Sequence, residues 1–241
     1  MAALLRSLLF ALFQAVITFV FAIVALLCLP LPARARYRII TTWSRLMVAG
    51  AESICGIRYR VLGAENVPQL PFIVLSKHQS AWETLAFQII FPPQVWVVKR
   101  ELLWIPFFGW GLALLSPIAI DRGAGSRALN QLLEQGRERL ARRYCIVIFP
   151  EGTRVAPGRR GRYQAGGAWL AVRTGTPVLP VAHNAGELWP RDAFIKRPGL
   201  VTISIGTPID TRQLTPAELN GKVEDWIENE VRRISGSQQP S

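Results

Sequence analysis

No charged residue occurs in the apolar segment from Ser7 to Leu31, which reads SLLFALFQAVITFVFAIVALLCLPL. About 20 apolar residues in an α-helix suffice to cross the hydrocarbon core of a bilayer, so this segment is long enough to enter a membrane. Pro30 and Pro32 predict that the helix ends close to them. A cleaved signal peptide is disfavoured, because the apolar stretch exceeds the usual length of about 7–15 residues.

Basic residues flank this segment unequally. Only Arg6 precedes it, whereas four arginines follow closely: Arg34, Arg36, Arg38 and Arg45. This bias predicts that the downstream end, and the rest of the chain, lie on the cytoplasmic side. Residues 36–56 carry an apolar stripe at helical spacing and predict a second helix. The two helices would form a membrane-associated pair within residues 1–56, and the sequence leaves open whether residues 7–31 cross the bilayer or lie in one leaflet.

From about residue 57 the pattern changes to short apolar runs that alternate with amphipathic segments. Strands are predicted at RYRVLG, FIVLS, VWVVK, YCIVIF, PVLPVA and LVTISIG, and helices at 80–90, 126–143 and 216–234. Ser126 is the expected cap of the second of these helices. The alternation indicates an α/β domain over residues 57–235, with a mostly parallel sheet flanked by helices. Residues 236–241 are predicted to be a disordered tail.

The charge and the cysteines narrow the functional class. The chain of 241 residues has a net charge of +12, which suggests an anionic partner, either nucleic acid or a phospholipid surface. Nucleic-acid binding explains the charge but not the 25-residue uncharged segment, so we expect a membrane partner and no nucleic acid. Cys28, Cys55 and Cys145 are widely spaced and form no metal-binding motif, so no metal site or disulfide framework is predicted.

Three polar clusters follow predicted strands directly. KHQSAWE follows FIVLS, KREL follows VWVV, and PEGTR follows CIVIF. Ligands of open α/β sheets bind outside the carboxyl ends of the strands. We therefore expect the three clusters to converge on one mouth of the sheet.

The first cluster allows two interpretations of His78 and Glu83. In the first, residues 80–83 form a capping box, in which Ser80 caps the helix and Glu83 reaches back to the Ser80 N–H. In the second, Glu83 accepts a hydrogen bond from the His78 imidazole, fixes its tautomer and stabilises the imidazolium. A spacing of five on a continuous helix would separate the side chains by about 140°, so they meet only if His78 lies in the turn before the helix.

The other two clusters carry basic residues. Lys99 and Arg100 end a strand, and Arg154 follows a turn at Pro150 and Gly152. Arginine binds phosphate in a bidentate way, and glycine allows the backbone to approach a ligand. The neighbouring aromatic residues suit a bilayer interface or an acyl channel, and they are Trp96, Trp104, Phe107, Phe108 and Trp110.

Together these blocks resemble the glycerolipid acyltransferase family, of the 1-acyl-sn-glycerol-3-phosphate acyltransferase type. HQSAWE is similar to its His-x4-Asp block, KRELLWIPFFG to its second block, FPEGTR to its third and VLPVA to its fourth. The resemblance covers residues 57–210. Two positions depart from the pattern, since Glu83 stands where the family usually has Asp and Lys77 where it often has Asn. Lys77 would lower the imidazole pKa or help to bind an anion, and the sequence does not distinguish these roles.

The resemblance implies acyl transfer from acyl-CoA or acyl-carrier protein to the hydroxyl of lysophosphatidic acid, which forms phosphatidic acid. His78 would be the general base and Glu83 would orient it. Backbone N–H groups at the helix start would stabilise the oxyanion. The acceptor phosphate would be held by Lys99, Arg100 and Arg154, with Glu151, Gly152 and Thr153 shaping the pocket. No metal or cofactor is implied.

Other functions remain open at this point. Within the family, the acceptor would instead be a lyso-ornithine lipid or another lysophospholipid. From other classes, the chain would be an esterase, or a non-catalytic membrane-binding protein with no need of His78 or Glu83.

Overall fold

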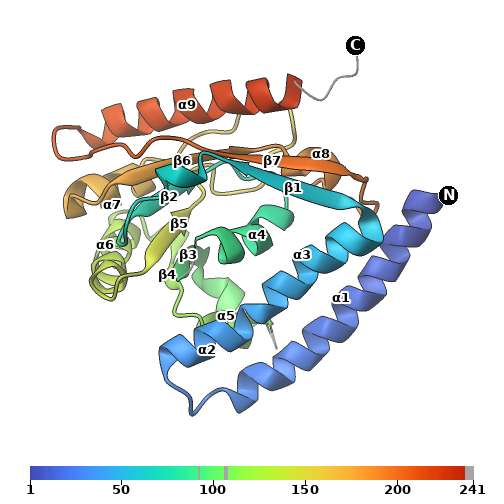
Figure 1. Ribbon diagram of the computed structural model, residues 1–241. Coiled ribbons are helices and arrows are strands. Elements are labelled where there is room, and N and C mark those ends of the chain that lie inside the picture. The colour runs from blue at the N-terminus through green and yellow to red at the C-terminus, as the bar shows by residue number, and fades with distance from the viewer. Residues whose placement is uncertain (92, 106–107, 237–241) are drawn as a thin grey trace.

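The computed structural model describes residues 1–91, 93–105 and 108–236 (Figure 1). Most of the predicted tail at 236–241 therefore lies outside the described residues, as does Phe107 of the aromatic stretch.

The N-terminal segments form a helical hairpin on one side of the molecule (Figure 1). α1 spans Ala2–Leu27, α2 Ala33–Ile40 and α3 Thr42–Cys55. The single second helix predicted for residues 36–56 is thus divided at Thr41. The Thr41 hydroxyl donates to the Tyr37 carbonyl at 2.8 Å, a contact that bends helices.

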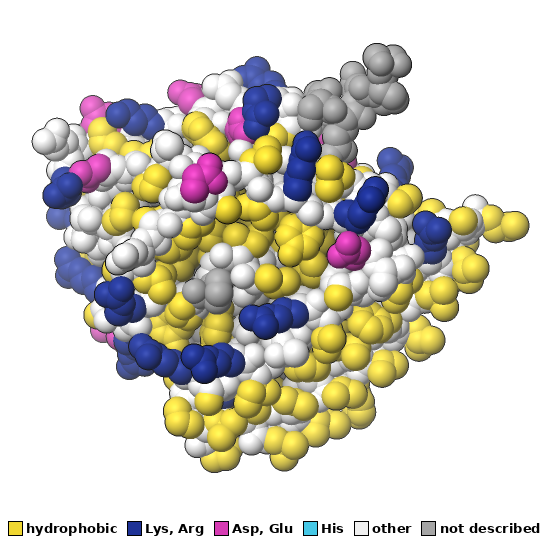
Figure 2. Space-filling view, in the orientation of Figure 1, with side chains coloured by type: hydrophobic (Ala, Val, Ile, Leu, Met, Phe, Trp, Pro, Cys, Tyr) yellow, Lys and Arg dark blue, Asp and Glu magenta, His cyan; other side chains and the backbone are white. Residues whose placement is uncertain are grey.

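The outer face of α1 is apolar and exposed. α1 is long and apolar enough to cross a membrane, with a mean hydropathy of 2.6, and only 11% of its most apolar window is buried. In Figure 2 hydrophobic side chains cover the edge of the molecule that α1 forms. The inner face packs on α3, where Gly50 leaves room for the ring of Phe13.

A seven-stranded sheet forms the centre of the domain, in the order β1-β7-β6-β2-β5-β3-β4. The strands are β1 Ile57–Leu62, β2 Ile73–Ser76, β3 Gln94–Lys99, β4 Ile118–Ile120, β5 Cys145–Ile148, β6 Val178–His183 and β7 Gly199–Ile205. All neighbours pair in parallel except β6 and β7, which are antiparallel. The predicted mostly parallel sheet is confirmed, and the three-residue β4 was too short to be predicted.

Helices cover the sheet on both faces. They are α4 Trp82–Ile90, α5 Phe108–Ala113, α6 Ser126–Ala141, α7 Gly166–Thr174, α8 Ala185–Leu188 and α9 Pro216–Gly236, with 3₁₀ turns at Ala64–Asn66, Arg100–Trp104 and Arg122–Ala124. Ser126 is the first residue of α6, whose N-cap is Gly125 without a side-chain cap, so the predicted Ser126 cap is wrong. α7 begins with the glycine pair Gly166 and Gly167 and was not predicted.

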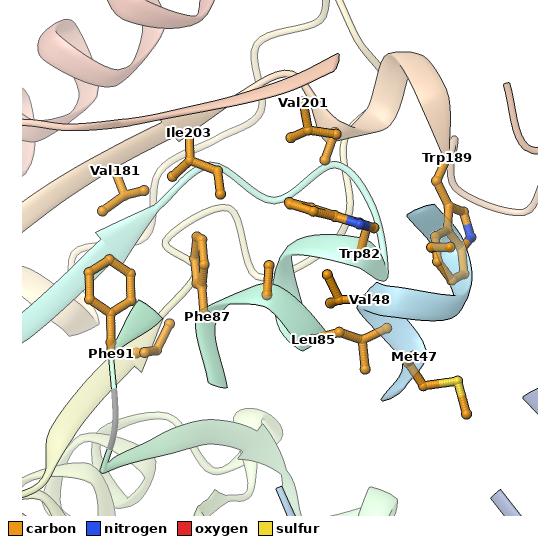
Figure 3. Close-up of a cluster of buried hydrophobic side chains, with 14 of the residues drawn as sticks. Met47, Val48, Trp82, Leu85, Phe87, Phe91, Val181, Trp189, Val201 and Ile203 are labelled. Carbon is orange, nitrogen blue, oxygen red and sulfur yellow. The ribbon is translucent and has the colours of Figure 1, made fainter. Parts of the chain in front are cut away.

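Two apolar cores lie on the two faces. On one face the side chains of α3 and α4 pack against the sheet, as Figure 3 shows for Met47, Val48, Trp82, Leu85 and Phe87. On the other face α6, α7 and α9 pack against the alternate side chains of the strands, among them Ile73, Ile146 and Val178. Neighbouring residues of one strand therefore face different cores, as the alternation of a strand requires.

Candidate active site

The three polar clusters meet as expected. They follow β2, β3 and β5, and β5 lies between the other two strands, so their carboxyl ends share one edge of the sheet. One cavity of about 1160 Å³ opens there and is lined by His78, Lys99 and residues 151–154. Most of its remaining wall is apolar and comes from α1, α3, α4 and α5 on one face of the sheet and from α6 and α7 on the other.

His78 lies before α4 and within reach of Glu83. α4 begins at Trp82, so the requirement that His78 stand outside the helix is met. The Nδ1 of His78 lies 2.8 Å from Glu83 Oε1, and the same oxygen accepts from the N–H groups of Gln79 and Ser80, each at 2.9 Å. Both interpretations of the spacing are therefore realised at once, because a single carboxylate oxygen holds the imidazole and the turn before the helix.

This hydrogen bonding changes the expected source of oxyanion donors. The N–H of Trp82 donates to Ser80 Oγ at 3.0 Å, and the N–H groups of Gln79 and Ser80 are used by Glu83. These three groups at the helix start are committed within the protein and are not free to bind an oxyanion. The expectation that they do so is wrong for these donors.

Glu83 is fully buried and ionised. Burial raises the pKa of its carboxyl, but His183, His78 and the Ser80 N–H outweigh this effect and leave the pKa below the ordinary value. Its second oxygen, Oε2, has no hydrogen-bond partner within the described part of the chain. The charge of Glu83 is thus directed at the imidazole and its turn.

His183 lies behind the pair, at the carboxyl end of β6. Its Nε2 is 2.8 Å from the Lys77 carbonyl, which can only accept, and its Nδ1 accepts from the Ala185 N–H at 3.3 Å. Both contacts require the neutral tautomer protonated at Nε2. Burial lowers the pKa of His183, in agreement with that tautomer. The rule used for the three clusters also applies to this histidine, but sequence analysis did not single it out.

The His78 ring is stacked on Phe149. The ring centroids are 3.9 Å apart and the planes differ by 12°. Phe149 directly follows β5 and precedes the third cluster, so the end of this strand places an apolar ring against the imidazole of the first cluster. The side chain of His78 is 17% exposed, and it faces the cavity.

Lys77 is buried away from the cavity. Its ammonium group lies 2.7 Å from Glu151 Oε1, 2.8 Å from Glu228 Oε1 and 3.1 Å from the Arg159 carbonyl. Three donors and three acceptors leave this lysine no proton for a substrate anion, which disfavours that role. Glu151 also accepts from the His78 N–H at 3.0 Å through Oε2, so its carboxylate joins the PEGTR loop to the histidine turn.

The basic residues differ in their relation to the cavity. Lys99 and Arg154 line it, whereas Arg100 is exposed and its guanidinium contacts Asp121 Oδ2 at 3.3 Å. Sequence analysis did not single out Arg191, which lines the cavity and donates to Thr153 Oγ1 and to the Arg154 carbonyl. Arg191 lies far along the chain from the PEGTR loop, and no local pattern marks it.

Comparisons with known proteins identify relatives of the chain. A family model described as Acyltransferase matches residues 58–184. The chain is 45% identical to a 1-acyl-sn-glycerol-3-phosphate acyltransferase of Pseudomonas aeruginosa over 98% of its own length and 93% of that protein. It is 30% identical to the human 1-acyl-sn-glycerol-3-phosphate acyltransferase alpha, over 73% of this chain and 62% of that one.

The structure is also similar to a solved one. The crystal structure of the 1-acyl-sn-glycerophosphate (LPA) acyltransferase of Thermotoga maritima matches it with a TM-score of 0.79 and 26% identity, over 98% of both chains. The fold, the order of the blocks and these relatives lead to one conclusion: the chain belongs to the Acyltransferase family.

Proposed function

We propose that this acyltransferase moves a fatty acyl group from an acyl thioester to the free hydroxyl of 1-acyl-glycerol-3-phosphate, forming phosphatidic acid. The observation that carries the proposal is the His78–Glu83 pair at 2.8 Å on a large, mostly apolar cavity with basic side chains in its wall. The names of the relatives support the same acceptor.

His78 acts as general base through Nε2. With Nδ1–H donating to Glu83, Nε2 is left as the acceptor and removes the proton of the acceptor hydroxyl. The oxygen forms a bond to the thioester carbonyl carbon, and the carbon–sulfur bond then breaks. The thiolate takes the proton from Nε2, so His78 ends in its starting form. Glu83 stabilises the imidazolium that exists between the two transfers.

The transfer proceeds without an acyl-enzyme intermediate. Ser80, two residues from His78 in the sequence, is fully buried and its Oγ caps the N–H of Trp82. Cys28, Cys55 and Cys145 are buried as well. We therefore propose direct attack by the acceptor hydroxyl, with no protein nucleophile taking part.

Lys99 and Arg154 bind the phosphate of the acceptor, with Gly152 and Thr153 forming the adjoining wall and Arg191 as a further cation. Arg100 does not line the cavity, and its contact with Asp121 holds the segment that follows Lys99. The apolar walls accept the acyl chains. Access from a bilayer fits the exposed apolar face of α1, and the arginines after it favour an active site on the cytoplasmic side. The donor is acyl-CoA or acyl-carrier protein.

The test is an assay of membranes that contain wild type or His78→Ala at equal protein levels. Each is supplied with acyl-CoA or acyl-carrier protein thioester and with lysophosphatidic acid, a lyso-ornithine lipid or lysophosphatidylcholine. We expect phosphatidic acid from wild type and a loss of at least about a hundredfold in His78→Ala. Full activity in His78→Ala would refute the mechanism, and a preference for another acceptor would refute the substrate.

A further inference from the structure

A buried group of charges lies beside the cavity, and only its Glu151 reaches the cavity wall. It consists of Lys77, Glu151 and Glu228, called here the Lys77 network. The side chains of Lys77 and Glu151 are 1% and 0% exposed, and that of Glu228 is 15% exposed. Burying a lysine costs free energy even when its ammonium is paired with carboxylates, so a functional role for this network is worth considering.

The network connects three segments that lie far apart in the sequence. Lys77 precedes the catalytic histidine, Glu151 belongs to the PEGTR loop, and Glu228 lies on α9, which packs along one side of the domain (Figure 1). Glu228 Oε1 also accepts from the Tyr163 hydroxyl at 2.9 Å. α9 thereby supplies a second carboxylate to the ammonium of Lys77, in addition to that of Glu151.

Glu151 carries this connection to the catalytic turn. One of its oxygens accepts from the Lys77 ammonium and from the Gly161 N–H, and the other accepts from the His78 N–H at 3.0 Å. Lys77 thus fixes the orientation of the Glu151 carboxylate through one oxygen. The carboxylate in turn fixes the position of the His78 backbone through its other oxygen. Lys77 itself does not line the cavity.

We propose that Lys77 is a positioning residue of the transferase site, which holds the Glu151 carboxylate on the His78 N–H, and that Glu228 of α9 fixes Lys77 in that place. The proposal rests on the proposed function, because it concerns the geometry of the same histidine. It explains why a lysine stands in the buried turn beside the base although it touches no substrate.

The experiment compares wild type, Lys77→Met and the double variant Lys77→Met/Glu228→Gln in membranes. Lys77→Met leaves two buried carboxylates without a cation. The double variant has the same formal charge in the network as wild type, minus one, but lacks the ammonium that holds Glu151. If Lys77→Met does not accumulate in membranes, the double variant still decides the question. Thermal unfolding gives the folded fraction of each protein.

We expect kcat per folded molecule to fall by at least about tenfold in both variants, because misplacing a reacting group by about 1 Å costs up to about a hundredfold. The acid limb of the kcat profile should move to higher pH. Burial raises the pKa of Glu151 and Lys77 opposes this effect, so without Lys77 the carboxylate becomes protonated and releases the His78 N–H at a higher pH. Loss of folded protein alone would not move that limb.

A matched control is the exposed pair Arg160 and Glu224, which joins the same loop to the same helix at 2.7 Å without reaching His78. Arg160→Met/Glu224→Gln should keep the wild-type kcat and pH profile. Wild-type kcat and pH profile in the double variant of the network would overturn the proposal, since the network would then serve charge balance alone. Failure of the proposed function is distinguishable, because wild type itself would then form no phosphatidic acid.

Discussion

Replacing Glu83 by Gln tests how much of the transfer depends on the charge beside the imidazole. The amide oxygen can still accept from the N–H groups of Gln79 and Ser80, which hold the turn at 2.9 Å. It can also accept from Nδ1–H, so the tautomer of His78 is kept. What is lost is the attraction between the carboxylate and the imidazolium that forms when Nε2 takes the proton.

The magnitude follows from the distance. Two unit charges at the 2.8 Å of this pair attract each other by about 6 kcal/mol at an effective dielectric constant of about 20. If about half of the proton has been transferred in the transition state, about 3 kcal/mol is lost. This loss corresponds to a fall in kcat of about a hundredfold.

The assay measures kcat with saturating lysophosphatidic acid and acyl thioester for wild type, Glu83→Gln and Glu83→Asp. Asp keeps the charge and is shorter by one carbon–carbon bond of about 1.5 Å, so a small shift of the helix start preserves the pair. We expect Glu83→Asp to stay within about tenfold of wild type. The reasoning is refuted if Glu83→Gln remains within threefold of wild type, or if Asp is worse than Gln.

Three further predictions concern the surroundings of this pair. Gly161→Ala should lower kcat, because the new Cβ would lie 2.7 Å from Glu151 Oε1. Gly221→Ala, whose Cβ would lie in open space, should keep the wild-type kcat, and equal kcat values for the two variants would contradict the prediction. Ala22 lines the cavity, so Ala22→Phe should take up cavity space and shift the preference to shorter acyl donors. Val16→Phe, on the exposed face of the same helix, should not shift it. The measurement is kcat/KM for a series of acyl donors of different chain length. The pKa of Glu83 in the folded protein lies below its ordinary value of 4.5. The Glu83 carboxylate therefore contributes fully to folding stability above pH 4.5, and this contribution is lost as the pH falls through the folded-state pKa. The melting temperature of wild type should therefore fall more steeply in acid than that of Glu83→Gln, and parallel curves would contradict the assignment.

The parts of the site that depend on strand ends were predictable. Buried parallel strands are continuous apolar runs, so FIVLS, VWVV and CIVIF located β2, β3 and β5 and the polar residues after them. The helical hairpin followed equally from the uncharged segment. β4 was missed because three residues carry no periodicity, and the division at Thr41 depends on a local hydroxyl contact.

Long-range pairing is what the sequence could not provide. Lys77 meets Glu228 across 151 residues, and Arg191 reaches the PEGTR loop across 37. No local pattern encodes such contacts, because they depend on how α9 and the segment after α8 pack on the finished sheet. The contacts of Glu83 are local, and there the sequence presented the cap and the imidazole as alternatives, whereas one carboxylate oxygen serves both.

The stacking of His78 on Phe149, combined with direct attack by the acceptor, has a kinetic consequence. A ring held flat at 3.9 Å against another ring, with Nδ1 tied to Glu83, cannot turn over between the two proton transfers. The atom that takes the proton from the hydroxyl must therefore also deliver it to the departing sulfur. Because the acceptor hydroxyl attacks the thioester directly in the proposed reaction, both substrates must also be present together beside this atom, so transfer proceeds through a ternary complex. Initial-rate plots at several donor concentrations should accordingly intersect, and no exchange of label between donor and free thiol should occur without acceptor.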